Sequence, residues 1–144
     1  MSTTAPQPAK LLYTARVHTT GGREKGEARS SDGRLNVKLS VPGVPGSGTN
    51  PEQLLAAGWS ACFESAMAVV AEQKKISLPA DLAINAEVDL NVTAGGDYFL
   101  RARLNVRVPS VERSIAQGLV DAAHQICPYS KAMRGNIDVV IDLI

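Results

Sequence analysis

The sequence of 144 residues has only two cysteines and no apolar stretch at its N-terminus. Two cysteines without a signal peptide argue against a framework of structural disulfides, and leave metal binding, redox chemistry or plain burial as their uses. The first ten residues, MSTTAPQPAK, are polar and contain proline, so no secretory signal is visible. We therefore expect residues 1–10 to form a flexible tail of a cytoplasmic protein.

Net charge is also nearly absent. Fifteen basic and fourteen acidic residues leave a formal net charge of +1, and neither sign forms a long block. Without a basic patch or a helix-turn-helix pattern, the sequence gives no support for binding to nucleic acid or to an anionic membrane surface. Internal repeats and low-complexity segments are lacking as well. The length fits one domain, expected over residues 11–144, which buries about two-thirds of its unfolded surface.

Soft metal ligands are too few for a convincing site. His124 and Cys127 have a plausible ligand spacing, but only Cys62 and His18 remain as further soft ligands. Neither a CxxC nor an HExxH motif accompanies them. We expect the protein to bind no metal.

The segment from residue 49 to residue 75 is the most distinctive part of the chain, and it contains Cys62. Asn50 can cap a helix, Pro51 fits its first position, and Glu52 places a negative charge at its positive end. A surface helix shows one apolar stripe, whereas apolar residues surround this one. Such a helix must be covered on most of its sides.

The helix could be covered either by a lipid membrane or by other parts of a folded protein. The run from residue 54 to residue 71 is just long enough to span a bilayer, but it contains Glu64 and consists largely of alanine. We therefore favour burial in protein. Because six strands and one other main helix are few to cover it, we expect a homodimer in which the sheets of two subunits enclose the central helices.

The remaining segments predict an α+β fold, in which antiparallel sheets pack on helices. Strands are expected at residues 11–18, 27–30, 35–41, 81–92, 98–108 and 137–144, with clear alternation in the fourth and fifth. A second helix begins at Ser110 as its cap, with Glu112 in its first turn, and ends near Cys127. Pro128 disfavours helix at the preceding residue, so Cys127 is expected at a helix break before a short third helix over residues 128–134.

A reactive Cys62 would need a positive group nearby. Only the thiolate is a good nucleophile, and apolar surroundings raise the pKa of a thiol. Arg23 follows two glycines, so its loop could reach over a pocket, and Glu52 could bind its guanidinium through two hydrogen bonds. Glu52 lies close to three helical turns before Cys62, on the same side. Each residue also has an ordinary interpretation: a solvated loop charge, a helix-start carboxylate, or, for Cys62 and Cys127, a buried thiol.

Four segments of the chain match one family. TGGRE (residues 20–24), SSDGRL (residues 30–35), NPEQLLAAGWSACF (residues 50–63) and AHQICPYSKAMRGN (residues 123–136) resemble the organic hydroperoxide resistance proteins, the Ohr branch of the Ohr/OsmC superfamily. The resemblance is continuous over residues 11–144. Asn36 is a departure, because many relatives have Asp there, but it does not touch the chemistry.

The resemblance implies a thiol-dependent peroxidase with an intertwined homodimeric fold, in which both subunits contribute to each pocket. Cys62 corresponds to the peroxidatic cysteine and Cys127 to the resolving cysteine, while Arg23 and Glu52 correspond to the pair that activates the thiolate and orients the peroxide. The family reduces alkyl and lipid hydroperoxides to alcohols and is regenerated by dihydrolipoyl groups of lipoylated proteins. It needs no bound metal or organic cofactor.

Three other interpretations stay open at this point. The chain could belong to the osmotically inducible branch of the superfamily, although the arginine of the GGR segment and CPYSKAMRGN favour the Ohr branch. It could be a non-enzymatic redox-sensing or small-molecule-binding module, or a structural domain with two inert thiols. His124 and Tyr129, beside Cys127, and Trp59 and Phe63, beside Cys62, are expected to serve packing or to line the pocket.

Overall fold

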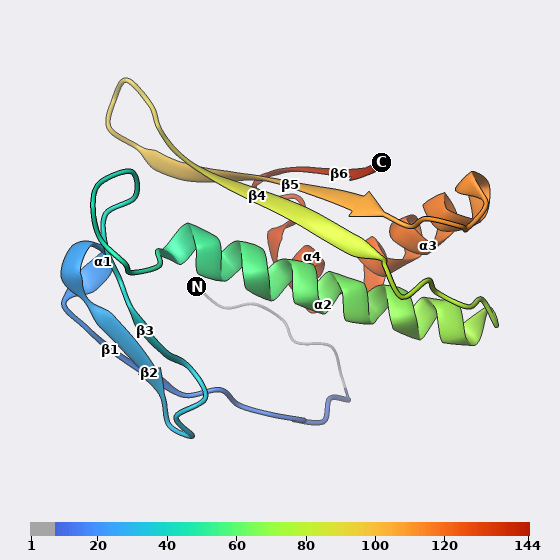
Figure 1. The fold of residues 1–144 in the computed structure, drawn as a ribbon, viewed down its shortest axis with the longest axis horizontal. Coiled ribbons are helices and arrows are strands. Elements are labelled where there is room, and N and C mark those ends of the chain that lie inside the picture. Colours follow the sequence, from blue (N-terminus) through green and yellow to red (C-terminus); the bar gives the residue numbers. More distant parts are fainter. Residues whose placement is uncertain (1–7) are drawn as a thin grey trace. The chain divides into compact units, whose positions relative to one another are not determined.

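The computed structural model describes residues 8–144, which form two compact units (Figure 1). The N-terminal unit ends at Asn50, and the C-terminal unit comprises Pro51–Ile144. Of the tail predicted over residues 1–10, residues 1–7 lie outside the described residues, and residues 8–10 are exposed. The flexible tail and the single domain over residues 11–144 stay predictions.

The N-terminal unit is an antiparallel meander with strand order β1-β2-β3, in the region where the sequence predicted three strands. Its elements are β1 (Val17–Thr20), the short helix α1 (Gly22–Lys25), β2 (Glu27–Ser30) and β3 (Asn36–Lys38). In the turn between β2 and β3, Asp32 accepts hydrogen bonds from the Ser30 hydroxyl at 2.6 Å and from the Arg34 backbone N–H at 3.0 Å. The Asp-Gly turn therefore closes the hairpin locally.

The prediction of a strand over residues 11–18 is wrong for most of its length, because β1 begins only at Val17. The ladder with β2 ends at the pair Val17 and Ser30, and beyond it the Ser31 N–H donates once more, to the Arg16 carbonyl oxygen at 2.9 Å, before the chain enters the turn to β3. Leu11, Leu12 and Tyr13 are consequently 79%, 86% and 76% exposed within the single chain. The two glycines before Arg23 also form more than a loop, since Gly21, at φ 78°, is the N-cap of helix α1 and Gly22 is its first residue.

The C-terminal unit contains the predicted long helix α2 (Pro51–Gln73) and a sheet of order β4-β5-β6. β4 (Ala83–Val92) and β5 (Tyr98–Arg107), both predicted as strands, form an antiparallel hairpin, and β6 (Asp138–Leu143) pairs with β5. This last pairing is parallel, which differs from the antiparallel sheets predicted. A parallel neighbour needs a long crossover, and α3 (Arg113–Ile126) and α4 (Pro128–Met133) supply it (Figure 1).

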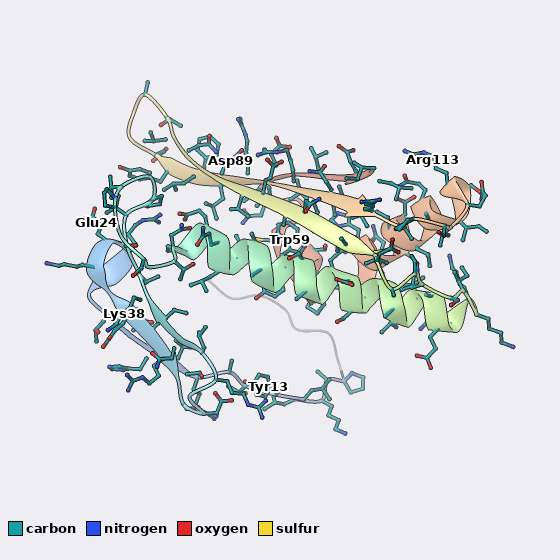
Figure 2. The ribbon with its side chains drawn as sticks, in the orientation of Figure 1. Tyr13, Glu24, Lys38, Trp59, Asp89 and Arg113 are labelled. Atoms are coloured by element: carbon teal, nitrogen blue, oxygen red, sulfur yellow. The ribbon has the colours of Figure 1, made fainter. Side chains whose placement is uncertain are left out.

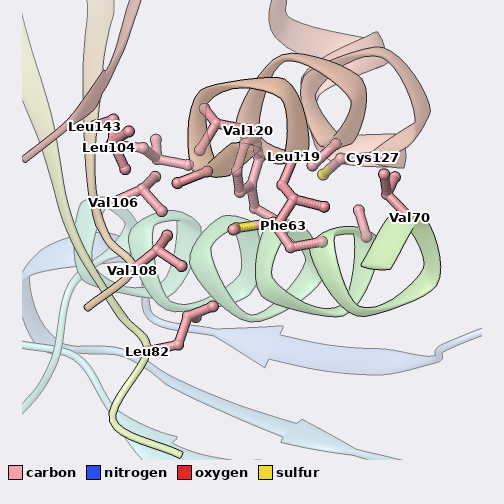
Figure 3. Packing of buried hydrophobic residues seen from close by; sticks show 14 of the residues in the cluster. Phe63, Val70, Leu82, Leu104, Val106, Val108, Leu119, Val120, Cys127 and Leu143 are labelled. Carbon is pink, nitrogen blue, oxygen red and sulfur yellow. The ribbon is translucent and has the colours of Figure 1, made fainter. Parts of the chain in front are cut away.

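Figure 3 shows the core between the inner face of this sheet and helices α2 and α3. On β5, Leu104 and Val106 are fully buried, whereas the intervening residues point to the charged outer face. The alternation in the sequence therefore correctly predicted which face of β5 points towards the core. Phe63 from α2 and Leu119 from α3 are fully buried in the same cluster. The α+β fold with sheets and a long central helix is confirmed.

The start of α3 differs from the prediction, and its end agrees with it. Ser110 has φ 67° and does not cap the helix; Glu112 does, accepting hydrogen bonds from the backbone N–H groups of Ser114 and Ile115 at 3.2 Å each. At the other end, Cys127 is extended, with φ −61° and ψ 123°, and lies between α3 and α4. The proline after Cys127 thus breaks the helix where expected.

Helix α2 is only half covered by its own chain. Its buried residues lie along one side and are Trp59, Phe63, Ala66, Met67, Val70 and Ala71. Ala57, Ala61, Ala68 and Val69 are exposed. Among residues 8–144, α2 alone is long and apolar enough to cross a membrane, a test that the core helix of a soluble protein also passes. Its apolar residues extend round the helix as predicted, and the described residues of the chain leave one side of it exposed.

Candidate active site

The structure brings the two cysteines together. Cys62 is half-buried on the fourth turn of α2, and Cys127 is completely buried at the break between α3 and α4. Both are free thiols, and the Cys127 thiol lies within hydrogen-bonding reach of Cys62. Two residues far apart in the sequence are therefore neighbours. Their arrangement suits the formation of a disulfide when Cys62 is oxidised.

Local backbone contacts fix Cys127 at this place. Its N–H donates to the carbonyl oxygen of Ala123 at 2.8 Å, which closes the last turn of α3. The chain then turns and begins α4 with Pro128, which needs no backbone donor there. At the end of α4, Arg134 Nη1 donates to the carbonyl oxygen of His124 at 2.6 Å and ties α4 back to α3. The helix before Cys127 and the helix after it together fix the backbone position of Cys127.

Opposing effects act on the protonation of Cys62. Burial is the largest and raises the pKa of its thiol, because it disfavours the charged form. The backbone N–H of Tyr129 donates to the Cys62 sulfur and lowers the pKa, whereas the Cys127 thiol raises it further. The net result is a raised pKa. These surroundings favour the thiol, so a reactive thiolate at Cys62 needs an additional positive charge.

Two side-chain contacts attach the beginning of α4 to α2. The buried indole of Trp59, labelled in Figure 2, donates from Nε1 to the buried Ser130 hydroxyl at 3.1 Å. One residue earlier on each helix, the ring of Tyr129 lies against Gly58, where a Cβ would come within 2.5 Å of the tyrosine oxygen. Sequence reasoning assigned Trp59 and Tyr129 to packing or to the lining of the pocket, and it missed Gly58 and Ser130. No local pattern shows which turns of two helices will meet.

The structure places Glu52 and Arg23 on different units. Glu52 lies half-buried in the first turn of α2, as predicted, on the helix that carries Cys62. Arg23 lies in α1 of the N-terminal unit. The pairing of Arg23 with Glu52 and the approach of Arg23 to Cys62 therefore stay predictions.

His124 lies three residues before Cys127, but its side chain lines a separate cavity. Within the described part of the chain its Nδ1 is buried without a hydrogen-bond partner, and burial together with the charge of Arg134 lowers its pKa. It lines a cavity of about 310 Å³ with Asp121, Gln125 and apolar residues of α3 and β6. In residues 8–144 no three His, Cys, Asp or Glu side chains gather closely enough to bind a metal ion.

A further cavity, of about 470 Å³, lies on the N-terminal sheet. Side chains of β1, β2 and the adjoining turns line it, among them Arg16, His18 and Arg29. None of the four predicted site residues contributes to this lining. The chemistry expected from the sequence is centred on the cysteine pair.

Comparison with known proteins agrees with this fold and identifies the family. A sequence model of the OsmC-like protein family matches residues 43–142. The chain is 50% identical over 140 residues to the organic hydroperoxide resistance protein of Xanthomonas axonopodis pv. citri (strain 306), covering 94% of this chain and 97% of that relative. It is 41% identical over 137 residues to the organic hydroperoxide resistance protein OhrA of Bacillus subtilis (strain 168), covering 92% and 96% of the two chains.

A solved structure extends the agreement to three dimensions. The crystal structure of the organic hydroperoxide resistance protein OhrB of Bacillus subtilis matches with a TM-score of 0.86 and 41% identity, over 93% of this chain and 100% of that one. Both the sequence and the fold agree over nearly the whole length of each protein. This chain therefore belongs to the OsmC-like family and, within it, to the organic hydroperoxide resistance proteins.

Proposed function

We propose that this protein is a cysteine-based peroxidase that reduces organic hydroperoxides to alcohols and thereby protects the cell from oxidative stress. The observation that carries the proposal is the pairing of the half-buried Cys62 with the buried Cys127. Relatives up to 50% identical are named for resistance to organic hydroperoxides, which supports detoxification of peroxides in general. The individual steps are derived from the chemistry of the residues.

The first step oxidises Cys62. Its thiolate attacks the distal oxygen of the hydroperoxide, the O–O bond breaks, and the leaving alkoxide takes up a proton to become the alcohol. Cys62 is left as sulfenic acid. Since burial raises the pKa of Cys62, the thiolate needs a cation, a role that we assign to Arg23. The guanidinium would also stabilise the charge that develops on the leaving oxygen, and Glu52 would orient it.

The second step uses Cys127. Its sulfur attacks the sulfenic sulfur of Cys62, the S–O bond breaks, and a disulfide and water are formed. The closeness of the two thiols supports a rapid reaction, because little chain movement is needed before the sulfurs can meet. Dihydrolipoyl groups then reduce the disulfide by thiol exchange and are themselves oxidised to the cyclic disulfide. The reductant is expected to be a lipoylated protein in the cytoplasm.

The substrate is expected to have an organic tail. Cys62 projects from a helix whose neighbouring positions are apolar, and an apolar pocket rewards an alkyl or lipid group more than hydrogen peroxide. An apolar wall also excludes water from the thiolate. We therefore expect bulky hydroperoxides such as cumene hydroperoxide to react faster than hydrogen peroxide.

A homodimer is part of the proposal. The uncovered side of α2 exposes alanines and Val69, which is 47% exposed, and residues 11–13 expose large apolar side chains. Single large apolar residues on a surface are ordinary, but a half-covered apolar helix favours a second copy as its cover. Ala61→Arg on the exposed side of α2 should convert dimer to monomer in size-exclusion chromatography with light scattering. Gln125→Arg, on the exposed side of α3, should leave the dimer intact.

Steady-state turnover tests the enzyme against the two non-enzymatic alternatives. Cumene hydroperoxide and dihydrolipoamide should be consumed continuously by the wild type, and Cys62→Ser should abolish this turnover. A redox sensor would oxidise once and then cycle slowly, and a domain with inert thiols would not react. Glu52→Gln should slow turnover, while Glu72→Gln, at the exposed far end of the same helix, should not. Wild-type turnover no faster than that of Cys62→Ser would refute the peroxidase.

A further inference from the structure

Gly58 occupies a position on α2 where glycine is unfavourable for the helix itself. Glycine loses more backbone entropy than alanine in a helix interior and offers no side chain to pack. Yet a Cβ at this position would lie 2.5 Å from the Tyr129 oxygen and 3.0 Å from Cζ of its ring. A Cβ atom essentially never comes within 3.0 Å of an atom to which it is not bonded. The absence of a side chain at Gly58 makes room for the ring of Tyr129.

The contact between Gly58 and Tyr129 lies close to both cysteines along the chain. Gly58 lies four residues before Cys62, one helical turn away on the same face of α2. Tyr129 lies two residues after Cys127, in the first turn of α4. The contact of the tyrosine ring with Gly58 thus sets the distance between two parts of the chain. One is the segment between α3 and α4 that carries Cys127, and the other is the turn of α2 that carries Cys62.

A second contact shows that the two helices meet in register. Trp59 and Ser130 follow Gly58 and Tyr129 directly, and their hydrogen bond of 3.1 Å is completely buried. Because both partners of this bond are fully enclosed, α4 cannot slide along α2 without breaking it and leaving buried polar groups unpaired. A side chain at Gly58 would have to push Tyr129 outward against this attachment. The displacement would be passed to Cys127 at the beginning of α4.

We propose that Gly58 is a positioning residue for disulfide formation, because it admits the Tyr129 ring and so keeps Cys127 within reach of oxidised Cys62. The inference rests on the two-cysteine cycle proposed above. Two reactions compete for the sulfenic acid of Cys62. Attack by the Cys127 thiol gives the disulfide and water, whereas a second hydroperoxide gives sulfinic acid and a second alcohol. Displacement of Cys127 slows the first reaction and leaves the second unaffected.

The test compares full-length Gly58→Ala with Gly118→Ala. Gly118 is also in a helix, but a Cβ there would meet only the flexible Lys74 Nζ, at 3.9 Å. The reduced proteins are treated with a small excess of cumene hydroperoxide, and intact mass separates disulfide, which has lost two hydrogens, from sulfinic acid, which has gained two oxygens. Gly58→Ala should show a several-fold larger share of sulfinic acid than wild type. Gly118→Ala should match wild type.

A rescue variant separates positioning from a general loss of stability. The tyrosine oxygen is the atom that a Cβ at Gly58 would meet first, so Gly58→Ala combined with Tyr129→Phe should regain much of the disulfide. This double variant also carries the test if Gly58→Ala alone does not fold. The proposal is overturned if folded Gly58→Ala forms disulfide like wild type, or if the double variant forms no more than Gly58→Ala. Wild type that forms no disulfide at all would instead overturn the two-cysteine cycle.

Discussion

The indole Nε1–H of Trp59 donates a hydrogen bond of 3.1 Å to the Ser130 hydroxyl, and both side chains are completely shielded from solvent. The bond joins the helix of Cys62 to the helix that follows Cys127. Ser130→Ala leaves the indole N–H buried without this partner, which should lower the free energy of unfolding by about 1–3 kcal/mol. Urea denaturation measures the change. Ser31→Ala, in an exposed turn, should change it by less than about 0.5 kcal/mol, and an equal effect of both substitutions would contradict the role of the bond.

Leu104 tests the core beneath the sheet. Its side chain is fully buried on the inner face of β5, so Leu104→Ala should lower the free energy of unfolding by about 2–5 kcal/mol through lost burial and a residual cavity. Val140, on the neighbouring strand β6, is 42% exposed and is the matched control. Val140→Ala should cost clearly less in the same denaturation experiment. Similar losses at both positions would mean that the sheet does not present this face to the core.

Arg23 tests the supply of positive charge to Cys62. If its guanidinium stabilises the thiolate, Arg23→Ala should raise the pKa of Cys62, because only the Tyr129 backbone N–H then opposes the effects of burial and the Cys127 thiol. Oxidation by cumene hydroperoxide should slow at neutral pH and recover as the pH is raised. Thiolate absorbance and the rate are followed against pH. Arg34→Ala, whose side chain is 91% exposed, should keep the wild-type profile, and an unchanged profile in Arg23→Ala would remove Arg23 from the mechanism.

The stability of Arg23→Ala should depend on pH through Cys62. A thiol whose pKa is raised in the folded state holds its proton after the unfolded chain has released it. The folded state is therefore relatively less stable once the pH rises above the ordinary thiol value of 9.0, and keeps the full contribution below it. Urea denaturation of reduced Arg23→Ala should show this decline. Adding Cys62→Ser should reduce it, and a decline that is equally steep without the thiol would assign it to other groups.

Much of the fold could be predicted from local patterns. Period-two alternation predicted both strands of the β4–β5 hairpin and their inward faces, since a strand with one buried face must alternate. Asn50 and Pro51 marked the start of α2, and Pro128 marked the break at Cys127. The errors have local physical causes. Residues 11–15 pair with no strand of the described residues, and Glu112 reaches the free N–H groups that Ser110 was expected to satisfy.

The candidate site could be predicted only in part. The cysteines were visible as residues, but their closeness depends on how α4 packs on α2, which no short-range pattern records. Gly58 and Ser130 had no signal for the same reason, because an isolated glycine or serine in a helix is compatible with many neighbours. The parallel pairing of β6 with β5 likewise follows from the crossover through α3 and α4 and not from the sequence of β6.

The reaction of the reduced protein with one equivalent of cumene hydroperoxide tests the central claim most directly. Free thiols are counted and the intact mass is recorded for wild type, Cys62→Ser and Cys127→Ser. A two-cysteine peroxidase predicts that the wild type loses both thiols without gaining oxygen, that Cys127→Ser gains oxygen on Cys62, and that Cys62→Ser does not react. Survival of both thiols in the wild type would contradict catalysis by Cys62 and Cys127.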